Sequence, residues 1–232
     1  MMRVLLTGAN RGLGLEWVRQ LAARGETVFA TCRQPEKAEA LQVLQRRFPD
    51  NVKVFPLDVR SQESIAQAVD AVAAHTDALD VLINNAGILF EHERITNLQA
   101  EHLEVSFQVN AIGPMMLAKQ ALPLLQRGKR PVVFNISTML ASLTLKTFSG
   151  YYSYSASKAA LNMLTRTLAA ELRPQEIIVV AVHPGWVRTE MGGPGAPLSP
   201  EVSVQGMLRL LDSLTMRHSG RFWTWEGQEH PW

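Results

Sequence analysis

Short runs of apolar residues recur along this chain, and a longer amphipathic segment follows each of them. The runs are rich in valine, isoleucine, leucine and phenylalanine, and each ends at a turn signal. They occupy Arg3–Leu6, Thr27–Thr31, Val52–Pro56, Val81–Asn84, Val132–Ile136 and Ile177–Val182. This alternation predicts βαβ units, with the apolar runs as strands and the amphipathic segments as helices.

The predicted strands are apolar on both faces, most clearly at Val179–Val182. Strands of this kind belong to a parallel sheet that helices cover on both sides. The pattern therefore predicts an α/β fold with a doubly wound, Rossmann-like sheet. No repeat or change in composition marks a boundary, so residues 1–232 are expected to form a single domain. Ligands of such sheets bind at the carboxyl ends of the strands, near the switch in strand order.

A glycine- and proline-rich stretch follows the sixth predicted strand. Residues 192–200 (GGPGAPLSP) cannot form a regular helix or a central strand, so a loop is expected over about residues 189–200. A flap over a bound ligand and a plain exposed connector both fit this loop. Trp223, Trp225 and Trp232 lie further along, and packing in a core or interface explains them better than a substrate role.

Charge and composition point to no macromolecular partner. The 23 basic and 21 acidic residues are scattered, without a basic run that would indicate a nucleic-acid or membrane surface. No apolar stretch approaches the roughly 20 residues of a membrane-spanning helix. Cys32 is the single cysteine, and the first strand leaves no room for a signal peptide, so the expected location is the cytoplasm. No metal ion is expected.

The first predicted strand runs directly into a glycine-rich turn, residues 7–14 (TGANRGLG), which opens a helix-like segment. Such a turn can hold the pyrophosphate of a dinucleotide. Gly8 would permit the tight turn, Gly12 the close approach of backbone to phosphate, and Gly14 the packing of helix on sheet. Because the spacing departs from the common dinucleotide fingerprint, a glycine-rich turn without a ligand is the alternative.

Tyr154 and Lys158 stand four residues apart, so one helical turn places a phenol and an ammonium on the same face. A free phenol has a pKa near 10, and efficient acid/base catalysis near neutrality requires that this pKa fall by about 3. Lys158 and a nearby nicotinamide cation would favour the phenolate, and further ammonium donors would hold ribose hydroxyls. The alternative is a buried aromatic residue beside a solvated helix charge.

A reduced carbonyl needs a second hydrogen-bond donor on its oxygen. A hydroxyl just past the fifth predicted strand is in the right place, and Ser137, Thr138 and Ser142 all stand in this region. The two serines are equally consistent with ordinary turn or capping residues.

The second predicted strand bears on the choice of coenzyme. Enzymes that use the unphosphorylated dinucleotide place an acid there against the ribose 2′-hydroxyl. This chain has none in residues 30–33 (ATCR). Arg33 and Arg11 could instead clamp a 2′-phosphate in bidentate fashion, which predicts NADP(H). Arg33 taken alone is equally consistent with a surface charge.

Together these motifs resemble those of the short-chain dehydrogenase/reductase family. Six motifs follow one another in the family's order and at its approximate spacing. They are the glycine turn, residues 57–59 (LDV), residues 84–87 (NNAG), Asn110, the Tyr-x-x-x-Lys pair and residues 184–189 (PGWVRT). The resemblance covers essentially the whole chain. Within the family, residues 151–154 (YYSY) and 226–232 (EGQEHPW) are similar to the carbonyl-reductase-like branch that includes the fly protein sniffer and the bacterial C-factor.

This resemblance implies roles for individual residues. Thr138 aligns where the family usually has serine, and Asn110 would help to hold a water that relays protons to Lys158; a satisfied polar residue in a helix kink is the alternative for Asn110. Asp58 would accept from the adenine amino group, while Val187 and Thr189 would meet the carboxamide. The other cofactor-binding positions that it implies are Asn10, Leu13, Val59, Asn85, Ala86, Gly87, Pro184 and Gly185.

The sequence thus predicts an NADP(H)-dependent oxidoreductase that reduces a carbonyl, with Tyr154 as proton donor or acceptor. Its substrate would be a hydrophobic ketone, aldehyde or quinone, because the nearby residues are apolar, namely Leu89, Phe90, Leu140, Phe148, Trp186 and Met191. The alternative is a cofactor-binding signalling or redox-sensing module of the C-factor type. A homodimer through the apolar face of Ala159, Leu161, Leu164 and Leu168 is also expected, although a helix buried on its own sheet has the same pattern.

Overall fold

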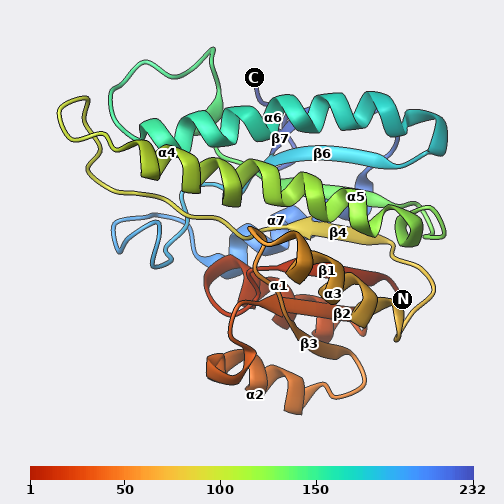
Figure 1. The fold of residues 1–232 in the computed structure, drawn as a ribbon. Helices are drawn as coiled ribbons and strands as arrows, with labels where there is room; N and C mark the ends of the chain where they lie inside the picture. The colour runs from red at the N-terminus through yellow and green to blue at the C-terminus, as the bar shows by residue number, and fades with distance from the viewer.

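A seven-stranded sheet crosses the middle of the molecule in the computed structural model, which describes residues 1–232 (Figure 1). All neighbouring strands are parallel, in the order β3-β2-β1-β4-β5-β6-β7. The strands are β1 (Arg3–Thr7), β2 (Thr27–Cys32), β3 (Val52–Pro56), β4 (Val81–Asn84), β5 (Val132–Ile136), β6 (Ile178–His183) and β7 (Phe222–Thr224). The predicted doubly wound α/β fold is confirmed.

Helices cover both faces of this sheet (Figure 1). They are α1 (Gly12–Ala23), α2 (Glu39–Arg47), α3 (Gln62–Ala73), α4 (Ala100–Phe107), α5 (Gly113–Leu125), α6 (Tyr152–Leu172) and α7 (Pro200–Ser213). A π-helical turn, Gln108–Ile112, joins α4 to α5, and short 3-10 turns lie at Pro35–Lys37, Met139–Ala141 and Arg173–Gln175.

Alternate residues of each strand enter two separate cores, as expected for strands that are buried on both faces. Leu6 and Phe134 lie in the core beneath α1, α2 and α7, where Trp17 meets Phe134 edge to face at 5.7 Å. Leu5 and Val133 lie in the core beneath α3, α5 and α6. The two cores fix the face of the sheet on which each strand residue packs.

The apolar face of α6 that we considered for a homodimer is used within the chain. Leu161 is fully buried, and Leu168 packs against the core on the α6 side of the sheet. Packing on the chain's own sheet therefore accounts for this pattern, and association of two copies stays a prediction.

The strand order switches between β1 and β4, because the chain passes from β1 outward to β2 and β3 and then returns to the other side of β1. Ligands of such sheets bind outside the carboxyl ends of the strands at this point. In Figure 1 these ends lie on the left, where the segments after β1, β4 and β5 project. The residues predicted for catalysis and cofactor binding follow these same strands.

Asp80 ties β1 to β4 at the opposite end of the sheet. Its carboxylate is 3% exposed, and it accepts hydrogen bonds from the Arg3 backbone at 2.8 Å, the Arg3 guanidinium at 3.0 Å and the Lys129 backbone at 2.6 Å. Burial by itself raises the pKa of Asp80, but the hydrogen bonds from Arg3 and Lys129 outweigh it and hold the pKa below its ordinary value.

Asp80→Ala is expected to lower the free energy of unfolding at pH 7 by about 3 kcal/mol, because it leaves the Arg3 guanidinium and two backbone N–H groups without their acceptor. Since the folded pKa is depressed, the wild type has this stabilisation at neutral pH and loses it as pH falls below about 4. Urea unfolding between pH 3 and 7 would measure both effects. A difference between the two proteins that does not shrink towards pH 3 would contradict this assignment.

Candidate active site

The glycine-rich turn after β1 is held in place by the segment after β4. The Thr7 hydroxyl accepts from the backbone N–H groups of Asn85 and Ala86 at 3.0 and 2.9 Å. In return, the Asn85 amide donates to the Thr7 and Gly8 carbonyls at 2.9 and 3.2 Å. Asn85, predicted to bind cofactor, is therefore also a brace for the turn, and Thr7 is a structural partner that the sequence analysis did not single out.

Two glycines of the turn are required by their surroundings. Gly8 has a φ of +66°, in the left-handed region that favours glycine. A Cβ on Gly14 would lie 2.0 Å from the Gly8 carbonyl oxygen, so no larger residue fits without movement of the backbone. Both observations agree with the roles predicted for these glycines, a tight turn and close packing of α1 on the sheet.

The first turn of α1 is open to an anion. No side chain caps it and no acidic residue stands in it. The first N–H groups of a helix need an acceptor from outside, and the helix dipole favours a negative one. Gly12 and Leu13 are partly exposed at this position, and the nearby Asn10 is exposed. The turn therefore fits the pyrophosphate of a dinucleotide.

Tyr154 and Lys158 lie on the buried face of α6 and are 9% and 3% exposed. The Lys158 ammonium donates to the Ile136 carbonyl at the end of β5 at 2.7 Å. Burial lowers the pKa of Lys158 to about 7 and raises the pKa of Tyr154 to about 12, although a hydrogen bond with Thr138 opposes the second shift. The chain by itself thus keeps the phenol protonated, in contrast to the expected fall of its pKa beside Lys158.

The first turn of α6 is fixed by a carboxylate from a distant loop. Tyr151 precedes the helix with a φ of +56° and makes no side-chain cap. Glu93, buried in the segment between β4 and α4, accepts from the Ser153 N–H at 3.0 Å instead. This contact fixes the backbone next to Tyr154, and nothing in the spacing of the sequence predicts it.

From the sequence alone, any of three hydroxyls after β5 could be the second donor of the site. Their hydrogen bonds in the structure distinguish them. Ser137 donates to Asn162 at 2.6 Å, and Ser142 donates to the Trp232 carbonyl at 3.0 Å. The Thr138 hydroxyl accepts from the Leu140 N–H at 3.2 Å, and it is the one that contacts the Tyr154 side chain. We therefore favour Thr138 as the second hydroxyl of the site.

Thr138→Ala is expected to lower the turnover of a carbonyl substrate by about 100-fold, because one donor to the developing oxyanion is lost. Thr138→Ser should restore most of the rate. Ser137→Ala is the matched control, since it removes a neighbouring hydroxyl that bonds to Asn162, and it should retain turnover. Steady-state kinetics of the three variants would test this assignment, and a rate loss in Ser137→Ala equal to that in Thr138→Ala would overturn it.

Asn110 lies in the π-helical turn and is fully buried. Its amide donates to the Ile88 carbonyl and the Ser157 hydroxyl, both at 3.0 Å, and its oxygen accepts from the Ile88 N–H at 2.9 Å. A Cβ on Gly87 would lie 3.3 Å from this oxygen and 3.7 Å from the Lys158 nitrogen, so the three residues converge. The Asn110 side chain thus links Ile88 to Ser157. Its part in a water relay to Lys158 stays a prediction.

The predicted coenzyme-selecting residues lie at the surface. Arg33 is exposed after β2, and Arg11 forms an ion pair with Glu190 from the segment after β6. Asp58 is paired with Arg60 at 2.7 Å, and its hydrogen bond with Arg60 lowers the pKa of the carboxyl group. The adjacent Val59 is partly exposed. The pairing of Arg11 with Glu190 and of Asp58 with Arg60 could not be foreseen from spacing.

Residues 184–199 after β6 form a compact loop rather than a loose connector. Val187 bridges to Leu198, the Trp186 indole donates to the Gly192 carbonyl at 2.8 Å, and the Arg188 guanidinium donates to the Ala196 carbonyl at 3.0 Å. Thr189 lies against Gly12, since a Cβ on Gly12 would be 3.4 Å from the Thr189 methyl group.

The start of the same loop joins β6 to these contacts. Pro184 is buried, and its carbonyl accepts from the Ser203 hydroxyl at 2.6 Å. Gly185 has a φ of +86° beside Trp225. The preceding His183 is largely buried, and burial, with a smaller effect of His230, lowers its pKa to about 4. The loop therefore reaches from β6 to the glycine turn, where the predicted flap would lie.

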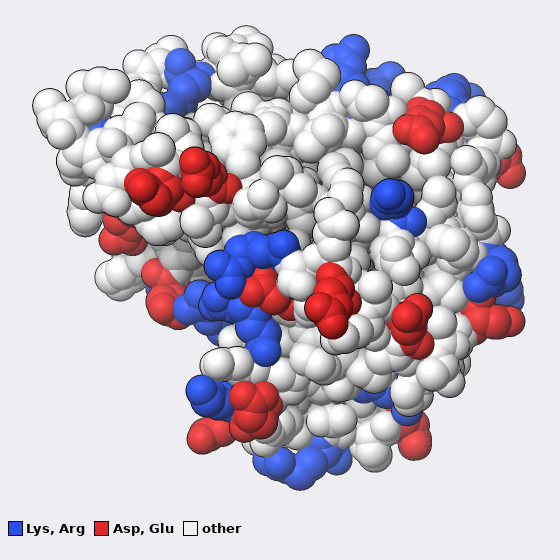
Figure 2. Space-filling view, viewed as in Figure 1, with Lys and Arg blue, Asp and Glu red and all other residues white.

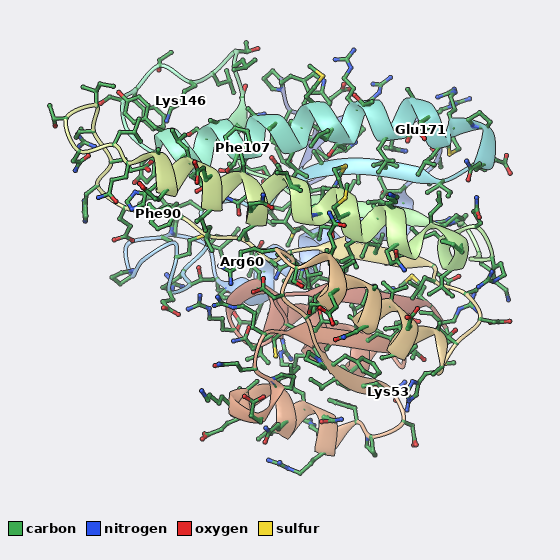
Figure 3. All side chains as sticks on the ribbon, in the orientation of Figure 1. Lys53, Arg60, Phe90, Phe107, Lys146 and Glu171 are labelled. Atoms are coloured by element: carbon green, nitrogen blue, oxygen red, sulfur yellow. The ribbon has the colours of Figure 1, made fainter.

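Apolar residues are exposed on the loops around the site. Phe148 is 50% exposed and Trp186 58% exposed, and Phe90 stacks on His102 with ring centroids 3.8 Å apart. Figure 3 labels Phe90 and Lys146 on the two loops that project at this end of the molecule. Figure 2 shows basic and acidic side chains interspersed over this face, with largely uncharged surface at the upper left, around the same loops.

Two further features bear on the kind of site. No helix has both the length and the apolar character needed to cross a membrane. No three His, Cys, Asp or Glu side chains are grouped so that they could hold a metal ion.

A doubly wound sheet, an open glycine turn at its switch point and a buried Tyr-x-x-x-Lys pair beside a hydroxyl define a dinucleotide-dependent oxidoreductase. Comparison with known proteins agrees: a family model described as short chain dehydrogenase matches residues 2–196. The chain therefore belongs to the short-chain dehydrogenase family.

Three individual proteins are similar to this chain over two thirds of its length or more. The C-signal of Myxococcus xanthus is 42% identical over 157 residues, which cover 68% of this chain and 95% of that protein. The NADPH-bound carbonyl reductase from chicken fatty liver is 38% identical with a TM-score of 0.95, covering 100% of this chain and 99% of the other. The carbonyl reductase Sniffer of D. melanogaster is 35% identical with a TM-score of 0.95 and full coverage of both chains. The expected resemblance to the sniffer and C-factor branch is confirmed.

Proposed function

We propose that this protein reduces the carbonyl group of a small, largely apolar molecule with NADPH. The observation that carries the proposal is the convergence of Tyr154, Lys158 and Thr138 at the carboxyl end of β5, beside the open glycine turn. The solved carbonyl reductase that is similar over the whole chain was crystallised with NADPH, which supports the choice of coenzyme.

The residues present fit this coenzyme. The uncapped first turn of α1 offers N–H groups to the pyrophosphate, and Gly8, Gly12 and Gly14 keep side chains out of the way. Arg33 and Arg11 would face the 2′-phosphate, and Asp58 the adenine. Lys158 has ammonium donors beyond its bond to Ile136, and these would hold the ribose. When bound, the reduced nicotinamide supplies the hydride.

Tyr154 supplies the proton in this reaction. Its phenol is protonated over the whole physiological pH range in the chain alone, which is the form that a proton donor needs. Thr138 would donate a second hydrogen bond to the same carbonyl oxygen and hold it towards the phenol. Lys158, whose pKa lies near 7, favours the phenolate once the proton has left.

The apolar loops around Tyr154 favour a hydrophobic ketone, aldehyde or quinone. Trp186, Phe148 and Met191 are each at least two fifths exposed, so they offer apolar surface that a substrate can cover. Oxidation of NADPH in the presence of aldehydes, diketones and quinones would test the function directly. Binding of NADPH without turnover of any of these would count against it.

Arg33→Ala is expected to weaken the binding of NADPH by about 10-fold to 100-fold and to leave that of NADH unchanged, because a charge-assisted contact with the 2′-phosphate is lost. Titration calorimetry with both coenzymes would measure this. Arg209→Ala, on the surface of α7, is the matched control and should bind both as the wild type does. Equal weakening of both coenzymes by Arg33→Ala would contradict the assignment.

A further inference from the structure

The segment after β7 folds back along the sheet edge. Glu229 forms an antiparallel bridge with Trp223, the Thr224 N–H donates to the Gln228 carbonyl at 2.8 Å, and the His230 N–H donates to the Phe222 carbonyl at 2.7 Å. The Trp232 ring then stacks on Phe222 with centroids 5.7 Å apart. We call residues 226–232 the tail. Its course is fixed by these contacts, and it ends against a different part of the chain.

That part is the segment just beyond Thr138. The main-chain oxygen of Trp232 accepts from the Thr144 N–H at 3.0 Å, the Thr144 hydroxyl at 2.8 Å and the Ser142 hydroxyl at 3.0 Å. The Trp232 ring also lies beneath the Arg166 guanidinium of α6, 5.9 Å from its centroid. Three donors on one oxygen make a specific tether rather than a chance contact.

Residues 142–151, which we call the substrate loop, join Thr138 to Tyr154, so both of its ends lie at the proposed reacting groups. The loop has little packing of its own, since Leu143 is 84% and Phe148 50% exposed. Its other hydrogen bonds are local, as in the Lys146 ammonium to the Gly150 carbonyl at 3.1 Å. The hydrogen bonds that join the substrate loop to a distant part of the chain are those with Trp232.

We propose that the tail is a positioning element for the substrate: Trp232 holds the substrate loop in the conformation that receives the carbonyl compound. This inference rests on the proposed function. A loop that is already ordered costs less free energy on binding than one that must be ordered by the substrate. Release of the tether should therefore weaken substrate binding and leave the coenzyme site, which lies at the glycine turn, unaffected.

Two variants remove opposite sides of the tether. Deletion of Pro231 and Trp232 removes the acceptor, and Ser142→Ala combined with Thr144→Val removes two donors while the tail stays on β7. Each is expected to raise the KM of a carbonyl substrate about 10-fold, with kcat changed less than about threefold and the NADPH Kd unchanged. Combined, they should do no more than either alone, because both break the same contact.

Thr167→Val is the matched control. It removes an exposed hydroxyl that donates within α6 to the Met163 carbonyl and not to the tail, and it should leave KM unchanged. Additive effects of the two tether variants, or equal losses in kcat and in NADPH binding, would overturn the proposal.

Limited proteolysis provides a readout that does not depend on turnover. Lys146 lies in the substrate loop, so tryptic cleavage after Lys146 is expected to be at least about 10-fold faster in both tether variants than in the wild type or Thr167→Val. Unchanged cleavage would overturn the tether. Faster cleavage with an unchanged KM would overturn its role in substrate binding. A wild type that reduces no carbonyl would contradict the proposed function, and the proteolysis would still decide whether the tether exists.

Discussion

Tyr154→Phe is expected to lower kcat/KM for carbonyl reduction by about 1,000-fold or more, while the affinity for NADPH stays unchanged. The substitution removes the one phenolic proton that faces Thr138 and preserves the ring that fills this buried position. General acid catalysis typically contributes about 100-fold to 10,000-fold, and the Lys158 ammonium bonds to the Ile136 carbonyl and is proposed to hold the ribose rather than the substrate oxygen.

Tyr152→Phe is the matched control, because it removes an exposed phenol two residues earlier on the same helix. It should retain the rate of the wild type. Stopped-flow or steady-state NADPH oxidation, together with titration calorimetry, would separate catalysis from coenzyme binding. A Tyr154→Phe protein that keeps more than a tenth of the wild-type rate would contradict the proton-donor role.

The same variant separates the enzyme from the alternative of a signalling or redox-sensing module. The relative that is 42% identical over 157 residues is called C-signal. A biological effect that persists in Tyr154→Phe, with coenzyme still bound, would show that this effect does not depend on turnover.

The fold was predictable because most of the strands are buried on both faces and are therefore largely apolar, as in β4, β5 and β6. Three of the strands, β3, β4 and β5, have the bounds that the pattern predicts, and β1, β2 and β6 differ by a single residue at their ends. The seventh strand, Phe222–Thr224, was missed. It has only three residues, and the tryptophans around it suggested packing without indicating a strand.

The site was predictable where one short motif contains the chemistry. Tyr154 and Lys158 lie on one helical turn, and the glycine turn follows its strand directly, so spacing alone brings these groups together. Contacts between distant loops were not predictable. Glu93 on the first turn of α6, Glu190 on Arg11, and Trp232 on the segment after Thr138 each join residues far apart in sequence.

The pKa of Tyr154 shows a different limit of the sequence. A lysine four residues away suggested a more acidic phenol, but the structure buries both groups, and burial disfavours the charged form of each. The hydrogen bond with Thr138 opposes the shift of the phenol, but its effect is smaller than that of burial. Residue spacing indicates which groups meet, whereas their burial decides the direction in which their pKa values move.

Gly14→Ala is the second large effect that we expect. The added Cβ would lie 2.0 Å from the Gly8 carbonyl oxygen and 2.7 Å from the Asn85 amide nitrogen, so α1 must move away from the turn. Overpacking of this kind costs about 3 kcal/mol, which corresponds to a fall in Tm of roughly 10 °C for a domain of this size. Displacement of the first turn of α1 should also weaken NADPH binding at least about 10-fold.

Gly195→Ala is the control for Gly14→Ala. Gly195 has an ordinary φ and open space where a Cβ would stand, so this variant should change neither Tm nor the NADPH Kd. Differential scanning calorimetry with and without NADPH would measure both quantities. Because the Asn85 amide binds the Thr7 and Gly8 carbonyls, Asn85→Ala should produce a smaller loss of the same kind. A Gly14→Ala protein with the Tm and NADPH affinity of the wild type would show that the turn is not a close contact and that coenzyme binding does not depend on it.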